Sequence, residues 1–285
     1  IMPLVEENRL MVRQGLNRLC TTRRTGLRAL IEVAGVTEPY TSMDLGFRLG
    51  PRLNAAGRLD TAHAALDLLL CEDACEAAEI ARDLDIQNRK RQTLEQQIQA
   101  EAAAQALQWM TASEPPQSLV IASRGWHPGV VGIVAARLMR QFYRPVFVIA
   151  VDGDGQGKGS GRSVPGVSLV AALDACRPLL TSGGGHDMAA GVGLREENLE
   201  PFRAAFAAQV REQTGGAALR QQCGGVGDGA TALMRCIADV HLQEIAALHP
   251  RLFLRLGQCR DQAGPVHAVH NIEQGDGIIG LVRLQ

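Results

Sequence analysis

The sequence lacks the features that would assign it to a membrane or to an oxidising compartment. No apolar run approaches the roughly 20 residues of a membrane-spanning helix. Glu6, Glu7 and Arg9 interrupt the first apolar residues too early for a secretory signal. Seven cysteines without a dense, regular spacing favour reduced thiols over disulfides. We therefore expect a cytoplasmic protein with no membrane partner.

Lysine and net charge are scarce as well. Lys90 and Lys158 are the only lysines, and the formal net charge is −1. Binding of a polyanion through the field of the whole molecule is therefore excluded, although a local basic groove is not. Arginine suits bidentate contact with phosphate, but a GC-rich coding sequence produces the same bias and is the simpler explanation.

What is present is ordinary for a globular protein of one large or two ordinary domains, with 46% hydrophobic and 21% charged residues. Residues 1–65 indicate short helices and turns, including a loop rich in Gly and Arg at 46–59. From 62 to 112 the chain has neither Gly nor Pro, which favours a long helix with Asp73 as its candidate N-cap. A helix of about 40 residues spans about 60 Å, so it is expected to join two lobes.

Residues 118–213 change to strands that alternate with helices, which indicates an α/β domain. Strands are expected at 118–122, 145–151 and 189–194, and helices at 129–142, 167–180 and 196–213. Glycine-rich turns are expected between them. Residues 216–285 show no strong pattern, with candidate strands at 251–256 and 277–284.

The run from Ser182 to Gly191 contains three glycines followed by His186. Gly184 and Gly185 leave the backbone N–H groups open to an anion, and His186 can donate a hydrogen bond to the same oxygen. The alternative is a tight turn with an incidental histidine.

A second turn, at 157–163, carries Ser160 and Arg162. Their side chains share a face if the segment is extended, and both can then contact one phosphate. Its alternative is a solvated hairpin.

Two further segments offer candidate substrate contacts. Arg52, Asn54 and Arg58 in the 46–59 loop can hold a phosphate, unless the arginines pair with acidic neighbours. Trp126 and His127 precede a helix start, where Trp126 either stacks on a base or packs at the helix entrance. The basic run 89–91 is typical of a solvated helix face.

Metal-ligand patterns are missing. The sequence has no Asp-His-His, no Asp-x-Asp and no His-x-x-x-His before these loops, and the histidines and cysteines of the tail lack zinc-site spacing. We therefore expect no metal ligand in this chain.

Five segments occur together in the order seen in one family. They are GFRLGPRLNAAGRL, the helix string 88–92, GWHPGVVGIVAARL, SGRSVPGVSL and GGGHDMAAG. The sequence over about residues 1–210 thereby resembles the RecJ-type single-stranded-DNA exonucleases of the DHH phosphoesterase superfamily. The resemblance implies an α/β protein: the end of a DHH lobe (1–65), a long connecting helix (66–113), a DHH-associated domain with a mixed sheet (114–215), and a tail that is a degenerate OB-fold or a diverged region (216–285).

The same resemblance implies a function. In this family two divalent ions, Mn²⁺ or Mg²⁺, hydrolyse single-stranded DNA from its 5′ end during repair and recombination, and a single-strand-binding protein or a helicase is a candidate partner. Carried over by position, Arg58, Ser160 and Arg162 would hold the terminal phosphate. Gly184, Gly185 and His186 would contact the phosphate near the scissile bond, which makes His186 the candidate catalytic residue.

The family also implies what this chain lacks. Its opening, Met2-Pro3-Leu4-Val5, follows the last metal-binding aspartate of the family and does not begin with an initiator methionine. We therefore expect a fragment whose metal ligands lie before residue 1 and which does not hydrolyse DNA alone. The alternatives are a phosphoesterase for oligoribonucleotides or cyclic dinucleotides, and a non-catalytic DNA-binding or scaffold relative.

Overall fold

The computed structural model describes residues 4–59, 61–220, 269–271 and 280–282. Contacts divide the chain into two compact units, 1–220 and 221–285. In the second unit, β6 (Val269–Asn271) and β7 (Gly280–Val282) form an antiparallel pair. The expected strand at 277–284 contains β7, whereas the strand at 251–256 and the OB-fold lie outside the described residues. No helix in the described ranges is long and apolar enough to cross a membrane.

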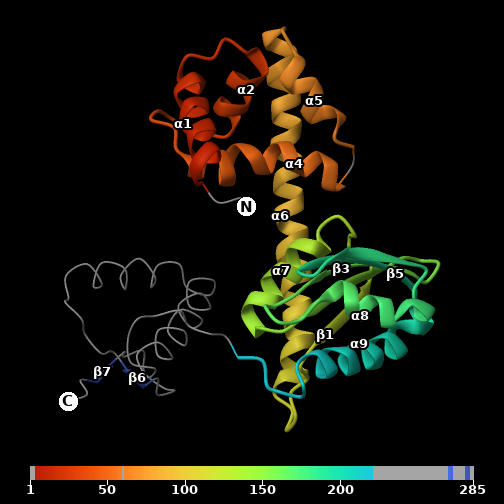
Figure 1. Ribbon diagram of the computed structural model, residues 1–285. Helices are drawn as coiled ribbons and strands as arrows, with labels where there is room; N and C mark the ends of the chain where they lie inside the picture. Colours follow the sequence, from red (N-terminus) through yellow and green to blue (C-terminus); the bar gives the residue numbers. More distant parts are fainter. Residues whose placement is uncertain (1–3, 60, 221–268, 272–279, 283–285) are drawn as a thin grey trace. The chain divides into compact units, whose positions relative to one another are not determined.

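The first half of unit 1 is helical (Figure 1). Its elements are α1 (Glu6–Cys20), α2 (Thr25–Val33), α3 (Ser42–Asp44), the π-helical turn η1 (Leu45–Leu49), α4 (Gly50–Leu59) and α5 (His63–Leu70). Helices α2, α4 and α5 pack against the first part of the long helix α6 (Ala74–Met110). Leu30, Leu68 and Leu84 are fully buried between them.

The prediction of a loop at 46–59 was wrong, because this segment forms η1 and α4. Pro51 follows the π-helical turn η1 within an unbroken helical segment from 42 to 59, so its missing N–H falls where the hydrogen-bond pattern changes from η1 to α4. Ala55 and Ala56 are completely buried, and α4 packs on α6. Tertiary burial of these small residues therefore outweighs the low helix propensity of the glycines around them.

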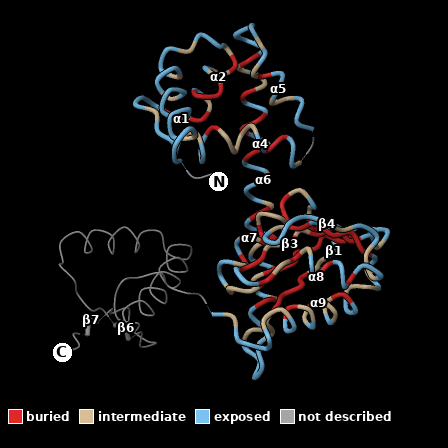
Figure 2. The backbone as a smooth tube through the Cα atoms, viewed as in Figure 1, coloured by how far each residue is buried: buried red, intermediate tan, exposed pale blue. Residues whose placement is uncertain are grey.

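Helix α6 begins where an aspartate caps it. Asp73 Oδ1 accepts hydrogen bonds from the N–H groups of Cys75 and Glu76, each at 2.8 Å, so the predicted cap is confirmed. Residues 71–73 separate α6 from α5, and the long helix therefore starts later than residue 66. Its 37 residues span about 55 Å. Buried residues occur along α6 from the helical part into the sheet domain (Figure 2), so one helix contributes to both cores.

The second half of unit 1 contains a five-stranded mixed sheet of order β1-β2-β3-β5-β4. Its strands are β1 (Leu119–Arg124), β2 (Val146–Val151), β3 (Gln156–Arg162), β4 (Ser182–His186) and β5 (Ala189–Arg195). Strands β1 and β2 are parallel, and the other pairs are antiparallel. The predicted α/β class with a mixed sheet is confirmed.

Helices cover the two faces of this sheet. Helices α6 and α7 (Val131–Phe142) pack on one face, and α8 (Leu169–Ala175) and α9 (Leu199–Gln213) on the other, with short 3₁₀ turns at η2 (Arg177–Leu179) and η3 (Glu196–Asn198). Residues of β2 alternate between them: Val146 and Val148 join the core under α7, while Phe147 and Ile149 join the core under α9. Every side chain of β2 is therefore buried.

The glycine-rich segments at 157–163 and 182–188 were expected as turns, but they contain β3 and β4, whereas the strand predicted at 189–194 is confirmed as β5. The inward positions of β3 are glycines because side chains of β2 occupy the space beside them. A methyl group at Gly161, for example, would lie 2.4 Å from Cε1 of Phe147. Side chains of β2 thus fill the space where the inward apolar side chains of β3 would normally lie. The sequence of β3 therefore does not alternate between apolar and polar residues.

Candidate phosphate-binding site

Two predicted ligands lie side by side on β3, on the face covered by α7. Ser160 pairs in register with Val148 and Arg162 with Val146, so both side chains point to the same face as these two valines. Gly132, in the first turn of α7, lies directly over them. A methyl group at Gly132 would be 3.2 Å from Oγ of Ser160 and 3.5 Å from Nη2 of Arg162. The first turn of α7 therefore borders a site with a hydroxyl and a guanidinium.

A second arginine reaches this site from the helical part. Arg58, in the last turn of α4, donates from Nη1 to the carbonyl oxygen of Gly129 at 3.4 Å. The carbonyl of Arg58 approaches Gly129 so closely that a methyl group there would lie 1.9 Å from it. Only glycine at position 129 allows α4 to end against the loop before α7. Arg58, Ser160 and Arg162, predicted together from distant segments, are brought together and are called the arginine–serine site below.

The charge in the arginine–serine site is not balanced by the described residues. Arg162 donates to the carbonyl of its neighbour Gly161 at 2.7 Å, and neither Arg58 nor Arg162 forms an ion pair in the described part of the chain. Burial lowers the pKa of Arg162, and the positive charge of Arg58 lowers it further. Two guanidinium groups that disfavour one another electrostatically are both stabilised when an anion binds between them.

The predicted residues of the glycine run lie on the same sheet face, two strands away. Arg162 is in register with Ala189 of β5 and through it with His186 of β4, and Ser160 is likewise aligned with Gly191 and Gly184. Two strand spacings are about 10 Å. Gly191 and His186 are exposed, and a methyl group at Gly184 would have no neighbour within 4 Å. We call Gly184, His186, Ala189 and Gly191 the open glycine face.

The hairpin that carries His186 is anchored at its turn. Asp187 Oδ1 accepts a hydrogen bond from the Ser168 hydroxyl at 2.5 Å, and the Met188 carbonyl accepts from the N–H of Ser163 at 3.1 Å. Gly185 has φ +151°, and a methyl group there would lie 2.5 Å from Cα of Ala190. The glycines therefore have different roles: Gly185 permits the backbone path, whereas Gly184 leaves the surface open.

Trp126 is a packing residue rather than an exposed stacking platform. Only 6% of the residue is exposed, and its indole N–H donates to Oε2 of Glu101 on α6 at 2.7 Å. This hydrogen bond lowers the pKa of Glu101. His127 is half-buried, and its Nδ1 accepts from the N–H of Gly129 at 3.1 Å. The predicted base-stacking role of Trp126 is thus not supported, while His127 shapes the loop that meets Arg58.

Arg52 and Asn54 do not reach the arginine–serine site through any contact in the described residues. Arg52 Nε forms an ion pair with Oδ1 of the buried Asp85 on α6 at 2.8 Å. The partner is therefore acidic, as the alternative interpretation expected, although Asp85 lies far along the sequence. Asn54 is exposed on α4. Arg52 holds α4 on α6 and so fixes the helix that carries Arg58.

A buried charge cluster of Arg91, Glu95 and Arg137 was not predicted from the sequence. The run 89–91 was interpreted as a solvated face, yet the Arg91 side chain is only 12% exposed and pairs with the buried Glu95 at 2.7 Å. Arg137 of α7 forms an ion pair with the same carboxylate. The spacing of Arg91 and Glu95, four residues apart on a helix, was a signal for the first pair. The contact between Glu95 and Arg137 depends on how α7 packs on α6, and no pattern in the sequence indicated it.

The described residues do not fit a divalent metal centre, because they contain no group of three or more His, Cys, Asp or Glu side chains placed to hold one.

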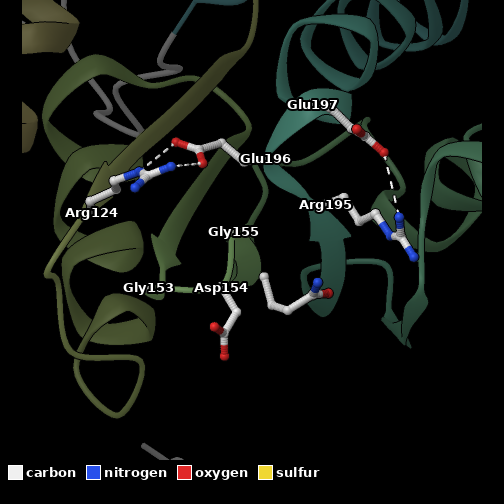
Figure 3. Close-up of a pocket in the computed structure, with 8 residues that line it drawn as sticks. Arg124, Gly153, Asp154, Gly155, Arg195, Glu196 and Glu197 are labelled. Carbon is white, nitrogen blue, oxygen red and sulfur yellow. Dashed lines mark hydrogen bonds and ion pairs between the residues drawn. The ribbon is translucent and has the colours of Figure 1, made fainter.

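A surface hollow at the other end of the sheet is lined by both positively and negatively charged side chains (Figure 3). There Arg124 contacts Glu196 through two hydrogen bonds of 2.9 and 2.5 Å, and Arg195 lies 3.8 Å from Glu197. With two arginines against the three carboxylates of Asp154, Glu196 and Glu197, that hollow is a poorer anion site than the arginine–serine site.

Comparison with known proteins gives a consistent assignment. Residues 116–212 match the DHHA1 domain. The chain is 44% identical over 219 residues to the single-stranded-DNA-specific exonuclease RecJ of Dickeya dadantii, and the match covers 74% of this chain and 38% of that protein. RecJ of Escherichia coli is 40% identical, with the same two coverages. The chain thus spans about 38% of the length of these relatives.

Solved structures agree with the sequence matches. A crystal structure of RecJ from Thermus thermophilus in complex with Mg²⁺ superposes with a TM-score of 0.64 at 37% identity, covering 74% of this chain and 32% of that one. A crystal structure of exonuclease RecJ bound to manganese gives a TM-score of 0.65 at 37% identity, covering 76% and 54%. The resemblance stated from the sequence is confirmed.

Proposed function

Because this chain carries a DHHA1 domain at 116–212 and is related to the RecJ exonucleases over 74% of its length, we propose that it is the substrate-binding part of a single-stranded-DNA exonuclease. One observation carries this proposal. Arg58, Ser160 and Arg162 come from elements distant in sequence and converge under the first turn of α7 without a carboxylate partner among the described residues. Such a group suits the dianionic end of a 5′-phosphorylated strand.

The open glycine face extends this site into a track for the strand. Apart from His186, this face carries no side chain beyond Cβ, which lets a phosphodiester approach the backbone closely. His186, at the edge of this face, is then the candidate catalytic residue that contacts the phosphate near the scissile bond by hydrogen bonding. The 5′→3′ direction of degradation follows from holding the 5′ phosphate at the arginine–serine site.

Hydrolysis depends on a part that the described residues do not contain. The matched RecJ structures contain Mg²⁺ or Mn²⁺, whereas the described residues hold no fitting ligand group. We therefore place the metal ligands outside the described residues and assign to these residues binding and orientation only. A place in DNA repair and recombination in the cytoplasm, with a single-strand-binding protein or a helicase as partner, belongs to the same proposal.

The test is end-dependent binding. Purified Arg162→Ala is expected to bind a 5′-phosphorylated oligonucleotide about tenfold more weakly than the unchanged chain, because a charge-assisted hydrogen bond is lost. Its binding of the matching 5′-hydroxyl oligonucleotide should change much less. Fluorescence anisotropy at fixed salt measures both dissociation constants.

Arg195→Ala is the matched control, since Arg195 is an exposed arginine at the far end of the same sheet. It should leave both dissociation constants unchanged. Equal losses on the two oligonucleotides for Arg162→Ala would remove Arg162 from end recognition. A wild-type chain that binds neither oligonucleotide would favour a scaffold relative instead.

A further inference from the structure

Helix geometry splits the basic run 89–91 into an outer and an inner arginine. Residues 89 and 91 are separated by about 200° around the helix axis. The Arg89 side chain is 75% exposed and the Arg91 side chain 12%. Arg89 pairs with Asp85 at 2.8 Å on the side of α6 that faces α4. Arg91 is instead directed toward the region where α6 meets α7.

Arg91 is held by two buried acceptors, and one of its three side-chain nitrogen atoms has no acceptor among the described residues. Its Nη1 donates to Oε2 of Glu95 at 2.7 Å, and its Nη2 donates to Oδ1 of Asn88 at 3.1 Å. Glu95 and Asn88 are each only 3% exposed. The Nε–H of Arg91 is buried and has no acceptor among the described residues. A buried guanidinium donor without an acceptor costs free energy unless a ligand satisfies it.

Glu95 does not neutralise the arginines around it. Arg137 of α7 shares its carboxylate with Arg91, so two positive charges face one negative charge. Burial lowers the pKa of Arg91 most, the charge of Glu95 opposes this shift, and the positive charges of Arg58 and Arg137 lower the pKa further. Arg58 lowers the pKa of Arg162 as well. Arg58 is therefore close enough to interact electrostatically with both Arg91 and Arg162.

Packing brings the same elements together. Leu59, next to Arg58, packs against the core that contains Ile98 of α6 and Val131 of α7. Arg91 and Glu95 are two turns and one turn before Ile98 on α6. The end of α4, the middle of α6 and the start of α7 therefore share one apolar core next to Arg58.

We propose that Arg91 is a further ligand of the phosphate held by Arg58 and Arg162, and that Glu95 is the positioning residue that orients Arg91 with its Nε–H toward that phosphate. The inference rests on the proposed function, because it adds a third guanidinium to the same site. Glu95 acts through Arg91 and touches no substrate.

Substitution of Glu95 separates orientation from charge. Glu95→Gln removes a negative charge beside the site, so an effect of charge alone would strengthen DNA binding. Loss of the carboxylate that orients Arg91 weakens binding instead, and we expect a fivefold to tenfold larger dissociation constant for the 5′-phosphorylated strand. Unchanged or tighter binding would overturn the positioning role. The amide is isosteric with the carboxylate, and a thermal melt verifies that the variant is folded at the assay temperature.

The salt dependence of binding measures how many phosphates the chain contacts, so it tests directly whether Arg91 contacts one. For single strands the slope of log K against log salt concentration is about −0.7 per phosphate contact. Arg91→Gln should reduce its magnitude by about 0.7 and weaken binding about tenfold. Arg89→Gln, two residues away on the same helix, should leave both values unchanged. Equal slopes for Arg91→Gln and the wild-type chain would contradict the contact.

Arg162→Ala separates failure of this inference from failure of the proposed function. A loss for Arg162→Ala together with wild-type behaviour of Arg91→Gln and Glu95→Gln would overturn only the role of Arg91. A wild-type chain without affinity for single-stranded DNA would overturn the proposed function and this inference together.

Discussion

Neighbouring glycines in the hairpin of β4 and β5 serve different purposes, which only the structure distinguishes. Gly185 has φ +151° and is enclosed by the backbone of Ala189 and Ala190, whereas a side chain at Gly184 would meet open space. The sequence predicted one anion-binding glycine run from both. A glycine required by the backbone and a glycine required by a ligand look identical in a sequence.

Alanine substitutions of these two glycines should therefore separate folding from binding. Gly185→Ala should lower the free energy of unfolding by about 2–3 kcal/mol, because the backbone conformation is strained for an L residue and the methyl group collides with Ala190. Gly184→Ala should change it by less than about 0.5 kcal/mol yet weaken single-strand binding several-fold, because the methyl group projects from the open face. Urea unfolding and anisotropy measure the two effects. Wild-type binding by Gly184→Ala would show that the strand does not cross this face.

At the scale of elements, helices and strands whose own side chains form a regular pattern were predicted well. Strand β2 reads as a buried strand because six consecutive residues are apolar, and α7 shows a helical apolar stripe. Strand β3 and helix α4 were missed because their stabilising contacts lie in other elements: Phe147 fills the space beside Gly161, and α6 covers Ala55 and Ala56. Glycine-rich segments carry no periodicity of their own, so their structure follows from packing.

The loop before α7 is tied to α6 by the hydrogen bond between Trp126 and Glu101, and this link should depend on pH. The pKa of Glu101 is lowered from 4.5 first by the Trp126 hydrogen bond and then by one from Gln97. A lowered carboxyl pKa in the folded state gives stabilisation that is fully present above pH 4.5 and is lost as the pH falls through the lowered value.

Trp126→Phe should therefore lower the free energy of unfolding by about 1 kcal/mol at pH 7, and this difference should shrink below the pKa of Glu101. Single-strand binding at pH 7 should be retained, because the ring is buried. Urea unfolding at pH 7 and at pH 3 follows the stability difference. A variant of unchanged stability that no longer binds DNA would instead restore the base-stacking role of Trp126.

For the whole molecule, net charge was a poor guide to the binding surface. The chain has a net charge of −1, yet Arg91 and Arg137 share one buried carboxylate, and the positive charge of Arg58 acts on both Arg91 and Arg162. The sequence predicted Arg58 and Arg162 as site residues through a family resemblance, not through composition. Their grouping with Arg91 and Arg137 depends on how α4, α6, α7 and β3 pack, which no local pattern encodes.

We expect this chain to bind single-stranded DNA without hydrolysing it. We would titrate the purified chain with labelled single-stranded and duplex DNA at low and moderate salt, and incubate the same samples with Mn²⁺ to follow cleavage. We predict salt-sensitive binding that favours the single strand, with no Mn²⁺-dependent cleavage. Cleavage that Arg162→Ala abolishes would show that the chain holds metal ligands of its own, and the absence of single-strand binding would contradict the assignment of a substrate-binding part.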